Sequence, residues 1–500
     1  MRLINIDTMK MEEFHGSEIP EYFILSHTWD AQGETSFQDY LWLDRHDEAI
    51  SQGVLSEMTP KQRERAEAKA QSIRSQAGFK KIERLAALAR GARAKLKKSP
   101  TGYRILWSSN VNHVWIDTAC INKESSAELS EAINSMFAWY RDAAACFAYI
   151  GDCDSGADLA KGRWFTRGWT LQELLAPKEV IFFSASWTAM GTRTTLASTI
   201  STITKIQPDY LLDRDHIPTA TVARRMSWAS NRSTTREEDM AYCLLGIFGI
   251  NMPLLYGEGH RAFIRLQEEI IRHDNDHTIF CWSWLTAQDP ESYPEWSGCL
   301  APQPSVFANS GHFVQAYLDE GKEPYEFQLT NAGLRINAVV LECLRETYKL
   351  VVFNAMESQP GGIQPRLVCV VVQSTLRGDI YLTRSCFPNR LLTLPYSHGA
   401  FGSPEARRTV YLVHERDPNA LFRKRPFTIQ PVSSGFLIRP PLHSVAAPSW
   451  LSISLSANKN LRYPDTRRNV VLPAQPCRHA FPLSRSLQPS LGRNSTARAR

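Results

Sequence analysis

Four short runs of apolar residues, separated by helix-like segments, set the strongest limit on the fold of this 500-residue chain. The runs are Tyr22–Ser26, Val114–Asp117, Cys146–Ile150 and Val180–Phe183. Uninterrupted apolar runs of this length are typical of strands buried on both faces of a parallel sheet. Between the second and third runs, apolar residues from Leu129 to Tyr140 recur at helical spacing. This alternation predicts an α/β fold in which helices flank a parallel sheet.

Polar side chains stand at the ends of the first two runs. Ser26 ends the first run, His27 and Trp29 come just after it, and Asp117 ends the second run. Ligands of open α/β sheets bind outside the carboxyl ends of the strands, so we expect Ser26 and Asp117 to face one cleft. His27 has the chemistry of a general base, although an exposed or hydrogen-bonded orienting histidine is the commoner case in a loop. Asp117 is equally suited to contacting a ligand and to capping the loop after its strand.

The segment Arg163–Pro177 brings two tryptophans, two arginines and one carboxylate into a short helix and its lead-in. The apolar face of this helix is formed by Leu171, Leu174 and Leu175. The same spacing places Glu173 roughly opposite that face, with Trp169 one turn earlier on the same side. A large aromatic side chain on a non-core side requires a surface partner, a ligand cleft or a second packed layer.

The composition is that of an ordinary soluble globular protein, with a mild formal net charge of +6. Basic residues are not gathered with aromatic ones into a stripe, so nucleic acid is not an expected partner. No apolar segment is long enough to cross a bilayer, and Met1–Asp7 lacks the pattern of a signal peptide. The ten cysteines form no Cys-x-x-Cys pair, which argues against zinc. We therefore expect a cytoplasmic protein with reduced cysteines, no metal and no bound cofactor.

Changes in composition divide the chain into four parts. In order, these are an α/β part (1–190), a helical extension (191–285), a β-rich part (286–455) and a polar tail (456–500). The first part contains a charged, helix-forming insertion near residues 41–75. Within the extension, Thr278–Trp284 has the pattern of a strand. The β-rich part predicts a smaller antiparallel sheet, and the tail, which is rich in Arg, Ser, Pro and Asn, is expected to be disordered.

Several segments together resemble the fungal heterokaryon-incompatibility (HET) domain family. They are Ile24–Trp29, Val114–Lys123, Ala132–Arg141 and Arg163–Pro177, followed by Arg225–Arg232 and Asp239–Gly259, which resemble the region after this domain. The resemblance covers roughly residues 1–285. It implies a role in self/non-self recognition between fungal individuals, with programmed cell death as the output. It also implies a fold remotely similar to TIR domains, in which the parallel sheet is flavodoxin-like.

The resemblance extends to a chemistry. In plant TIR domains, a Trp-Cys-Leu-x-Glu-Leu segment carries the glutamate required for cleaving NAD, and Trp169–Leu174 has the same spacing with Thr170 in place of Cys. By this comparison Glu173 is the catalytic residue, and NAD is a substrate rather than a cofactor. The expected binding residues are Ser26, His27, Trp29, Asp117, Arg163, Arg167 and Trp169.

Two interpretations of these residues stay open at this point. In the enzyme, Arg163 or Arg167 pairs with the pyrophosphate of NAD, while Trp29 or Trp169 stacks on one of its rings. In the alternative, Glu173 forms only a surface ion pair with Arg167 or Lys178, and the tryptophans are packed on the sheet. The domain is then an interaction module, which signals by self-association or by binding an unknown protein partner.

Overall fold

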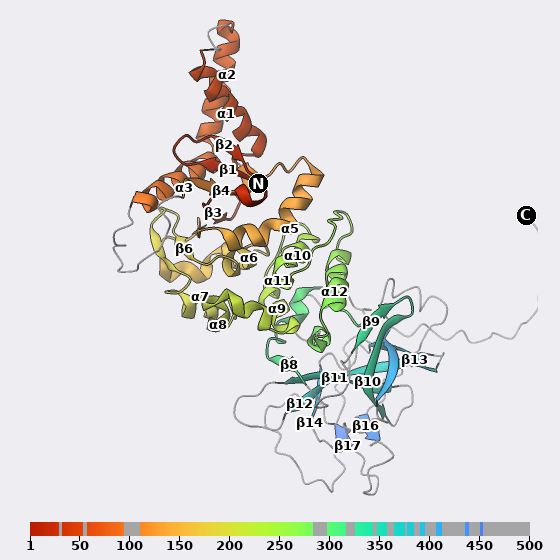
Figure 1. The fold of residues 1–500 in the computed structure, drawn as a ribbon. Helices are drawn as coiled ribbons and strands as arrows, with labels where there is room; N and C mark the ends of the chain where they lie inside the picture. Colours follow the sequence, from red (N-terminus) through yellow and green to blue (C-terminus); the bar gives the residue numbers. More distant parts are fainter. Residues whose placement is uncertain are drawn as a thin grey trace, which may run out of the picture.

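The computed structural model describes most of the chain up to residue 283 and parts of the remainder. The described residues are 1–29, 33–53, 58–94, 111–283, 298–316, 326–343, 348–357, 365–375, 378–384, 391–395, 407–412, 436–439 and 451–453. The predicted tail, 456–500, lies outside them. Figure 1 shows an α/β part at the N-terminus, a group of helices beside it, and a second sheet formed by later residues. The boundaries proposed between these parts stay predictions.

The first sheet has seven strands in the order β2-β1-β4-β3-β5-β6-β7. They are β1 (Arg2–Asn5), β2 (Met11–Glu13), β3 (Tyr22–His27), β4 (His113–Trp115), β5 (Ala145–Tyr149), β6 (Val180–Phe183) and β7 (Ala189–Thr192). The four central strands correspond to the four apolar runs. They are parallel, with Ile24 beside Trp115 on one side and Cys146 on the other. The parallel centre predicted from the sequence is therefore confirmed.

The prediction of a wholly parallel sheet is wrong at the edges, because β1, β2 and β7 run antiparallel to their neighbours. Only five residues connect β1 to β2, and five connect β6 to β7. A connection this short can form a hairpin but not the crossover that parallel strands need. The first sheet is thus mixed, with a parallel core flanked by antiparallel strands.

Helices from the first part cover this sheet or project from it. They are α1 (Phe37–Ser51), α2 (Pro60–Ser75), α3 (Ala77–Ala94), α4 (Asp117–Cys120), α5 (Ser126–Asp142) and α6 (Thr170–Leu175). In the predicted insertion, α2 begins after Thr59, whose side chain forms a capping box with Gln62. Helix α2 extends away from the sheet (Figure 1), and only Ala70 and Ile73 on it are buried. Helix α1 is different, because it packs Tyr40 and Leu43 into the core.

The extension consists mainly of short helices that share the core of the first part. They are α7 (Ala197–Thr204), α8 (Pro208–Leu212), α9 (Val222–Ala229), α10 (Asp239–Tyr242), α11 (Leu245–Phe248) and α12 (Arg261–His273). The strand predicted at Thr278–Trp284 is wrong: His277–Phe280 is a 3-10 helix. The physical reason for the 3-10 helix is local: the Asp276 side chain accepts a hydrogen bond from the Thr278 N–H at 2.8 Å and so caps a helical turn.

The later strands form a second sheet, as the β-type runs predicted. They are β8 (Phe313–Gln315), β9 (Phe327–Thr330), β10 (Gly333–Cys343), β11 (Tyr348–Glu357), β12 (Arg366–Thr375), β13 (Gly378–Arg384), β14 (Leu392–Pro395), β15 (Arg407–Leu412), β16 (Phe436–Arg439) and β17 (Leu451–Ile453). The pairings are antiparallel except for β13 with β15, which is parallel. The sheet buries one row of apolar side chains against the extension and another row in a separate cluster.

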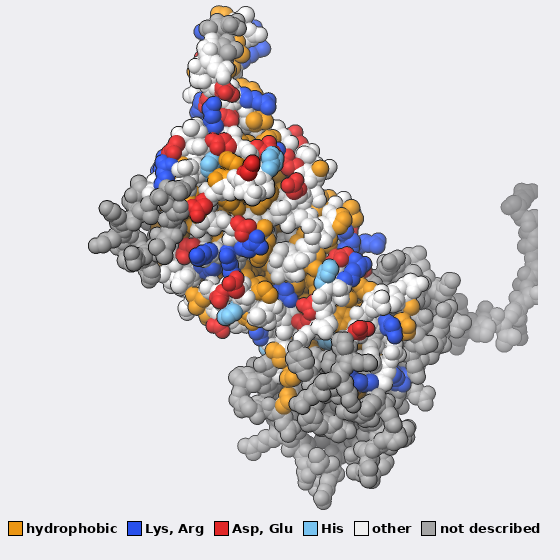
Figure 2. Space-filling view, in the orientation of Figure 1, with side chains coloured by type: hydrophobic (Ala, Val, Ile, Leu, Met, Phe, Trp, Pro, Cys, Tyr) orange, Lys and Arg blue, Asp and Glu red, His pale blue; other side chains and the backbone are white. Residues whose placement is uncertain are grey.

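Three further observations concern the described residues alone. No helix among them has the length and apolar character required to cross a membrane. No group of three or more His, Cys, Asp or Glu side chains in these ranges is placed to hold a metal ion. On the face shown in Figure 2, basic and acidic side chains lie interspersed and form no basic stripe.

Candidate functional site

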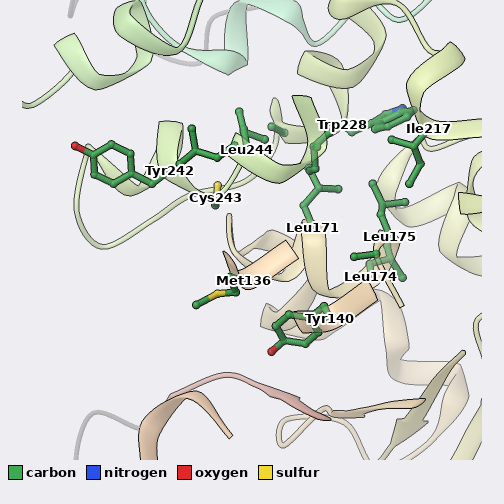
Figure 3. Packing of buried hydrophobic residues seen from close by; sticks show 14 of the residues in the cluster. Met136, Tyr140, Leu171, Leu174, Leu175, Ile217, Trp228, Tyr242, Cys243 and Leu244 are labelled. Carbon is green, nitrogen blue, oxygen red and sulfur yellow. The ribbon is translucent and has the colours of Figure 1, made fainter. Parts of the chain in front are cut away.

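Helix α6, which carries Glu173, is buried on every side. All six of its residues are buried, so the non-core side predicted for Glu173 does not exist. Figure 3 shows the leucines of α6 between α5, which carries Tyr140, and the extension, which contributes Ile217 and Trp228. The Glu173 side of the helix meets Ser26 of β3. Of the three explanations offered for an aromatic residue beside this helix, the second packed layer is the one observed.

Glu173 is joined to the carboxyl end of β3. Its carboxyl group accepts a hydrogen bond from the hydroxyl of Ser26, which is fully buried. That hydroxyl in turn accepts a hydrogen bond from the Nε1 of Trp164 at 2.7 Å. These groups therefore form a chain of hydrogen bonds, in which the indole donates to the hydroxyl and the hydroxyl donates to the carboxyl, and the chain fixes the position of the Glu173 side chain.

Burial dominates the ionisation of Glu173, whose exposed fraction is 7%. Burial raises the pKa of the Glu173 carboxyl to about 8. The hydrogen bond from Ser26 and the positive charges of Arg167 and Arg232 act in the opposite direction, while the negative charge of Asp117 adds to the rise in pKa. No ion pair within 4.0 Å joins Glu173 to Arg167 or Lys178 among the described residues, so the surface ion pair of the alternative interpretation is not present.

His27 lies between two carboxylates near this chain of hydrogen bonds. Its Nε2 is 3.5 Å from the Oε2 of Glu34, and its Nδ1 is 3.9 Å from the Oδ1 of Asp117. Only 1% of the His27 side chain is exposed, so it is not the exposed loop histidine that we considered. Glu34 also pairs with Lys81 at 2.5 Å. His27, the last residue of β3, therefore lies between the carboxylates of Glu34 and Asp117.

Asp117 and Trp29 form the outer rim of the same region. The Nε1 of Trp29 donates a hydrogen bond to the Oδ2 of Asp117 at 2.9 Å. The Nζ of Lys123 lies 3.8 Å from that carboxylate and 3.6 Å from the centre of the Trp29 ring, a cation–π contact. Burial lowers the pKa of Lys123, and the charge of Asp117 opposes this. Trp29 is 43% exposed, so it is the most accessible of these side chains.

The structure brings some of the predicted residues together and separates others. Ser26, His27, Trp29 and Asp117 lie at one end of the sheet with Glu173, as the parallel strand order requires. The side chain of Trp169 instead makes a hydrogen bond with Asp239 of α10.

The two predicted arginines, Arg163 and Arg167, differ in their exposure and in their interactions with this region. Arg163 is exposed, and its backbone N–H donates to the Oδ2 of Asp152 at 2.9 Å. Arg167 is partly exposed, and its positive charge acts on Glu173.

Two residues of this region were missed by sequence reasoning. Tyr140 of α5 donates its hydroxyl to the carbonyl of Leu25 at 3.0 Å, and its pKa is raised by burial and by the nearby Glu173. Arg232 comes from the extension and is buried against the lead-in to α6. Its only sequence signal was its place in the segment Arg225–Arg232, which carried part of the resemblance.

Comparisons with known proteins identify the first part of the chain. Residues 22–161 match the family described as "Heterokaryon incompatibility protein (HET)". The chain carries a HET domain. The matched residues run from β3 to the end of a 3-10 helix, Gly156–Lys161, so Glu173 and the extension lie beyond them. Residues 261–383 match a "Domain of unknown function (DUF8212)", which extends from α12 into the second sheet.

One curated relative supports the same family. "Vegetative incompatibility protein HET-E-1" of Podospora anserina is 44% identical over 196 residues, which amount to 37% of this chain. The matched part spans only 14% of that protein's length. No solved structure matches the chain.

Proposed function

We propose that this chain acts in vegetative incompatibility, the recognition of self and non-self between fungal individuals, and that its HET domain triggers cell death by cleaving NAD. The family match and the similarity to a vegetative incompatibility protein support the first part of this proposal. The second part rests on the arrangement around Glu173. In this second part of the proposal, the HET domain is a TIR-like NAD glycohydrolase.

The order of the central strands supports a TIR-like, flavodoxin-like fold. Counted along the chain, the parallel strands β3, β4, β5 and β6 are first to fourth, and in the sheet they stand in the order second, first, third, fourth. This is the order found in doubly wound flavodoxin-like sheets. Such sheets bind ligands where the order reverses, between the first and third strands. Ser26 lies at the carboxyl end of the first strand, β3, paired with Ala148 of the third, β5.

The observation that carries the proposal is the hydrogen bond between Ser26 and a buried Glu173 at this point of the sheet. When the bond between the ribose C1′ and the nicotinamide nitrogen breaks, the electron pair leaves with nicotinamide and C1′ becomes oxocarbenium-like. The carboxylate of Glu173 stabilises that positive charge or holds the ribose hydroxyls. Water then adds to C1′, which yields ADP-ribose and a proton.

Other residues of the site fit parts of the same substrate. The exposed ring of Trp29 offers a stacking surface for nicotinamide or adenine. Arg167 and the exposed Arg163 suit the pyrophosphate. His27 and Asp117 hold Trp29 and Lys123 in place from the side of the sheet.

One observation favours the alternative, a non-enzymatic interaction module. The Glu173 carboxyl is almost wholly buried, so a substrate reaches it only if the residues that cover it move. In an interaction module, the chain of hydrogen bonds from Trp164 to Glu173 serves only to hold α6 against the sheet. Self-association or a protein partner would then transmit the death signal without chemistry.

The test compares the purified full chain with two glutamine variants. Parent, Glu173→Gln and Glu179→Gln are incubated with NAD, and free nicotinamide is quantified; toxicity is scored in fungal cells that express each form. Glu179 is the matched control because it is a partly buried glutamate that directly precedes β6 and lies beside Thr192 and Arg193, at the opposite end of the strands from Ser26. The enzyme proposal expects release and death with the parent and the control, and neither with folded Glu173→Gln. If Glu173→Gln kills as well as the parent, the interaction module takes its place.

A further inference from the structure

Helix α6 depends on its neighbours for its existence. It has only six residues, far fewer than an isolated helix needs to be stable in water. Its N-cap residue, Trp169, makes no side-chain capping bond to the helix. The position of Glu173 is therefore set by whatever holds the lead-in to this helix.

A short segment of the extension holds that lead-in. We call residues 232–234 the clasp. The N–H of Gly168 donates to the carbonyl of Ser233 at 2.9 Å, and the N–H of Ser233 donates to the carbonyl of Thr166 at 2.8 Å. The two segments thus pair like a pair of parallel strands across Arg167 and Ser233. The approach is close enough that a Cβ on Gly168 would lie 2.5 Å from the Cγ2 of Thr234.

The guanidinium group of Arg232 adds hydrogen bonds between the clasp and α6. Its Nη1 donates to the carbonyl of Arg167 at 2.8 Å and to the Oγ1 of Thr170, the first residue of α6, at 3.0 Å. Its Nη2 is buried and makes no hydrogen bond among the described residues. Burying a guanidinium with an unmatched donor costs free energy, so a packing role alone does not explain why an arginine stands here.

The charge of Arg232 acts on Glu173. The titratable and charged side chains that face Glu173 are Asp117, Tyr140, Cys146, Arg167, Arg232 and Cys243. Among them, Arg167 and Arg232 are positive, and both favour the ionised form of Glu173 against the effect of burial. Arg167, which is partly exposed, has the larger effect of the two, and Arg232 adds to it from a buried position.

We propose that Arg232 is a positioning residue for Glu173, and that the clasp makes the helical extension part of the HET domain's functional unit. The matched family segment ends at residue 161, so this unit reaches at least 71 residues further along the chain. An effect of Arg232 on NAD cleavage rests on the proposed function. Its effect on the position and the ionisation of Glu173 does not. If Arg232 served only to pack the clasp, its charge would leave Glu173 unaffected.

The test measures Glu173 directly in the full chain. Glutamate labelled with ¹³C at the side-chain carboxyl carbon is incorporated, and the resonance missing from Glu173→Gln identifies Glu173. Its titration midpoint is compared in the parent, Arg232→Gln, Arg232→Lys and Arg236→Gln. Arg236 is the matched control, because it is exposed, lies four residues further on, and stacks on Tyr256.

We expect the Glu173 midpoint to move upward in Arg232→Gln, to move upward by less in Arg232→Lys, and to stay in place in Arg236→Gln. Should Arg232→Gln fail to fold, the comparison of Arg232→Lys with the parent decides, since lysine keeps a charge but loses the fork of N–H groups. An unchanged midpoint in every folded Arg232 variant overturns the inference. If the midpoint moves while the parent releases no nicotinamide, Arg232 is a positioning residue for Glu173, but the proposed enzyme activity is wrong.

Discussion

Replacing Glu173 by glutamine should change how the stability of the chain depends on pH. The pKa of Glu173 is raised by burial from 4.5 to about 8 in the folded chain, and it returns to its ordinary value on unfolding. Because the folded pKa is the higher one, the folded chain binds the proton more tightly. The contribution of Glu173 to stability is therefore fully present below about pH 4.5 and is lost as the pH rises through about 8.

The size of this effect follows from the two pKa values. The difference, 8 minus 4.5, is about 3.5 units, which corresponds to about 5 kcal/mol of unfolding free energy. Between about pH 5 and about pH 8.5, about 4 kcal/mol of it is lost. Glutamine keeps the shape of the side chain and an acceptor for Ser26 but has no proton to lose. The difference in unfolding free energy between Glu173→Gln and the parent should grow by about this amount over that range.

Urea unfolding at several pH values and constant ionic strength measures this difference. Glu131→Gln is the control, because Glu131 is an exposed glutamate on α5, so its variant should follow the parent at every pH. Curves of Glu173→Gln and the parent that stay parallel from about pH 5 to about pH 8.5 would show that the pKa of Glu173 is not raised. That outcome would mean that Glu173 is ionised and solvated in the folded chain.

Two further predictions concern the packing that holds the site. Ser26→Ala removes the acceptor of the buried Trp164 indole and the donor to Glu173, so it should lower the unfolding free energy by about 1–3 kcal/mol in urea; an unchanged midpoint would show that the chain of hydrogen bonds is unimportant for stability. Gly246→Ala should cost about 1–3 kcal/mol or more, because the new Cβ would lie 2.0 Å from the Cβ of Phe137 on α5. Its control is Gly91→Ala within α3, where nothing lies within 4 Å of the new Cβ and thermal unfolding should show no loss.

The parallel centre of the first sheet could be predicted from the sequence, and its edges could not. The runs that became β3 and β6 consist mainly of apolar residues and are buried throughout, which is the pattern of strands buried on both faces. The edge strand β2 has only three residues, none of them fully buried, so it has no apolar run to detect. Its pairing with β1 depends on a hairpin rather than on the residues of the strand itself.

The position of Glu173 shows a second limit of sequence reasoning. Spacing within α6 separates the leucines from Glu173, and this separation alone predicts a polar outer face. The prediction failed because the Glu173 side of the helix faces Ser26 at the buried end of β3, and because the lead-in to the helix is held by the clasp, whose residues lie about 60 positions further along the chain. The same distance in sequence hid Arg232, while Ser26, His27 and Asp117 could be grouped because parallel strands end at one edge.

The pH dependence of nicotinamide release would show whether the buried Glu173 takes part in the cleavage of NAD. The pH profile of kcat/KM reports the ionisation of groups in the free enzyme. With a pKa of about 8 for Glu173, the ionised fraction and the rate should rise about tenfold between about pH 7 and about pH 9. Glu173→Gln should release no nicotinamide at any of these pH values. A parent chain without nicotinamide release across the whole range, or a variant as active as the parent, would contradict a catalytic role of Glu173.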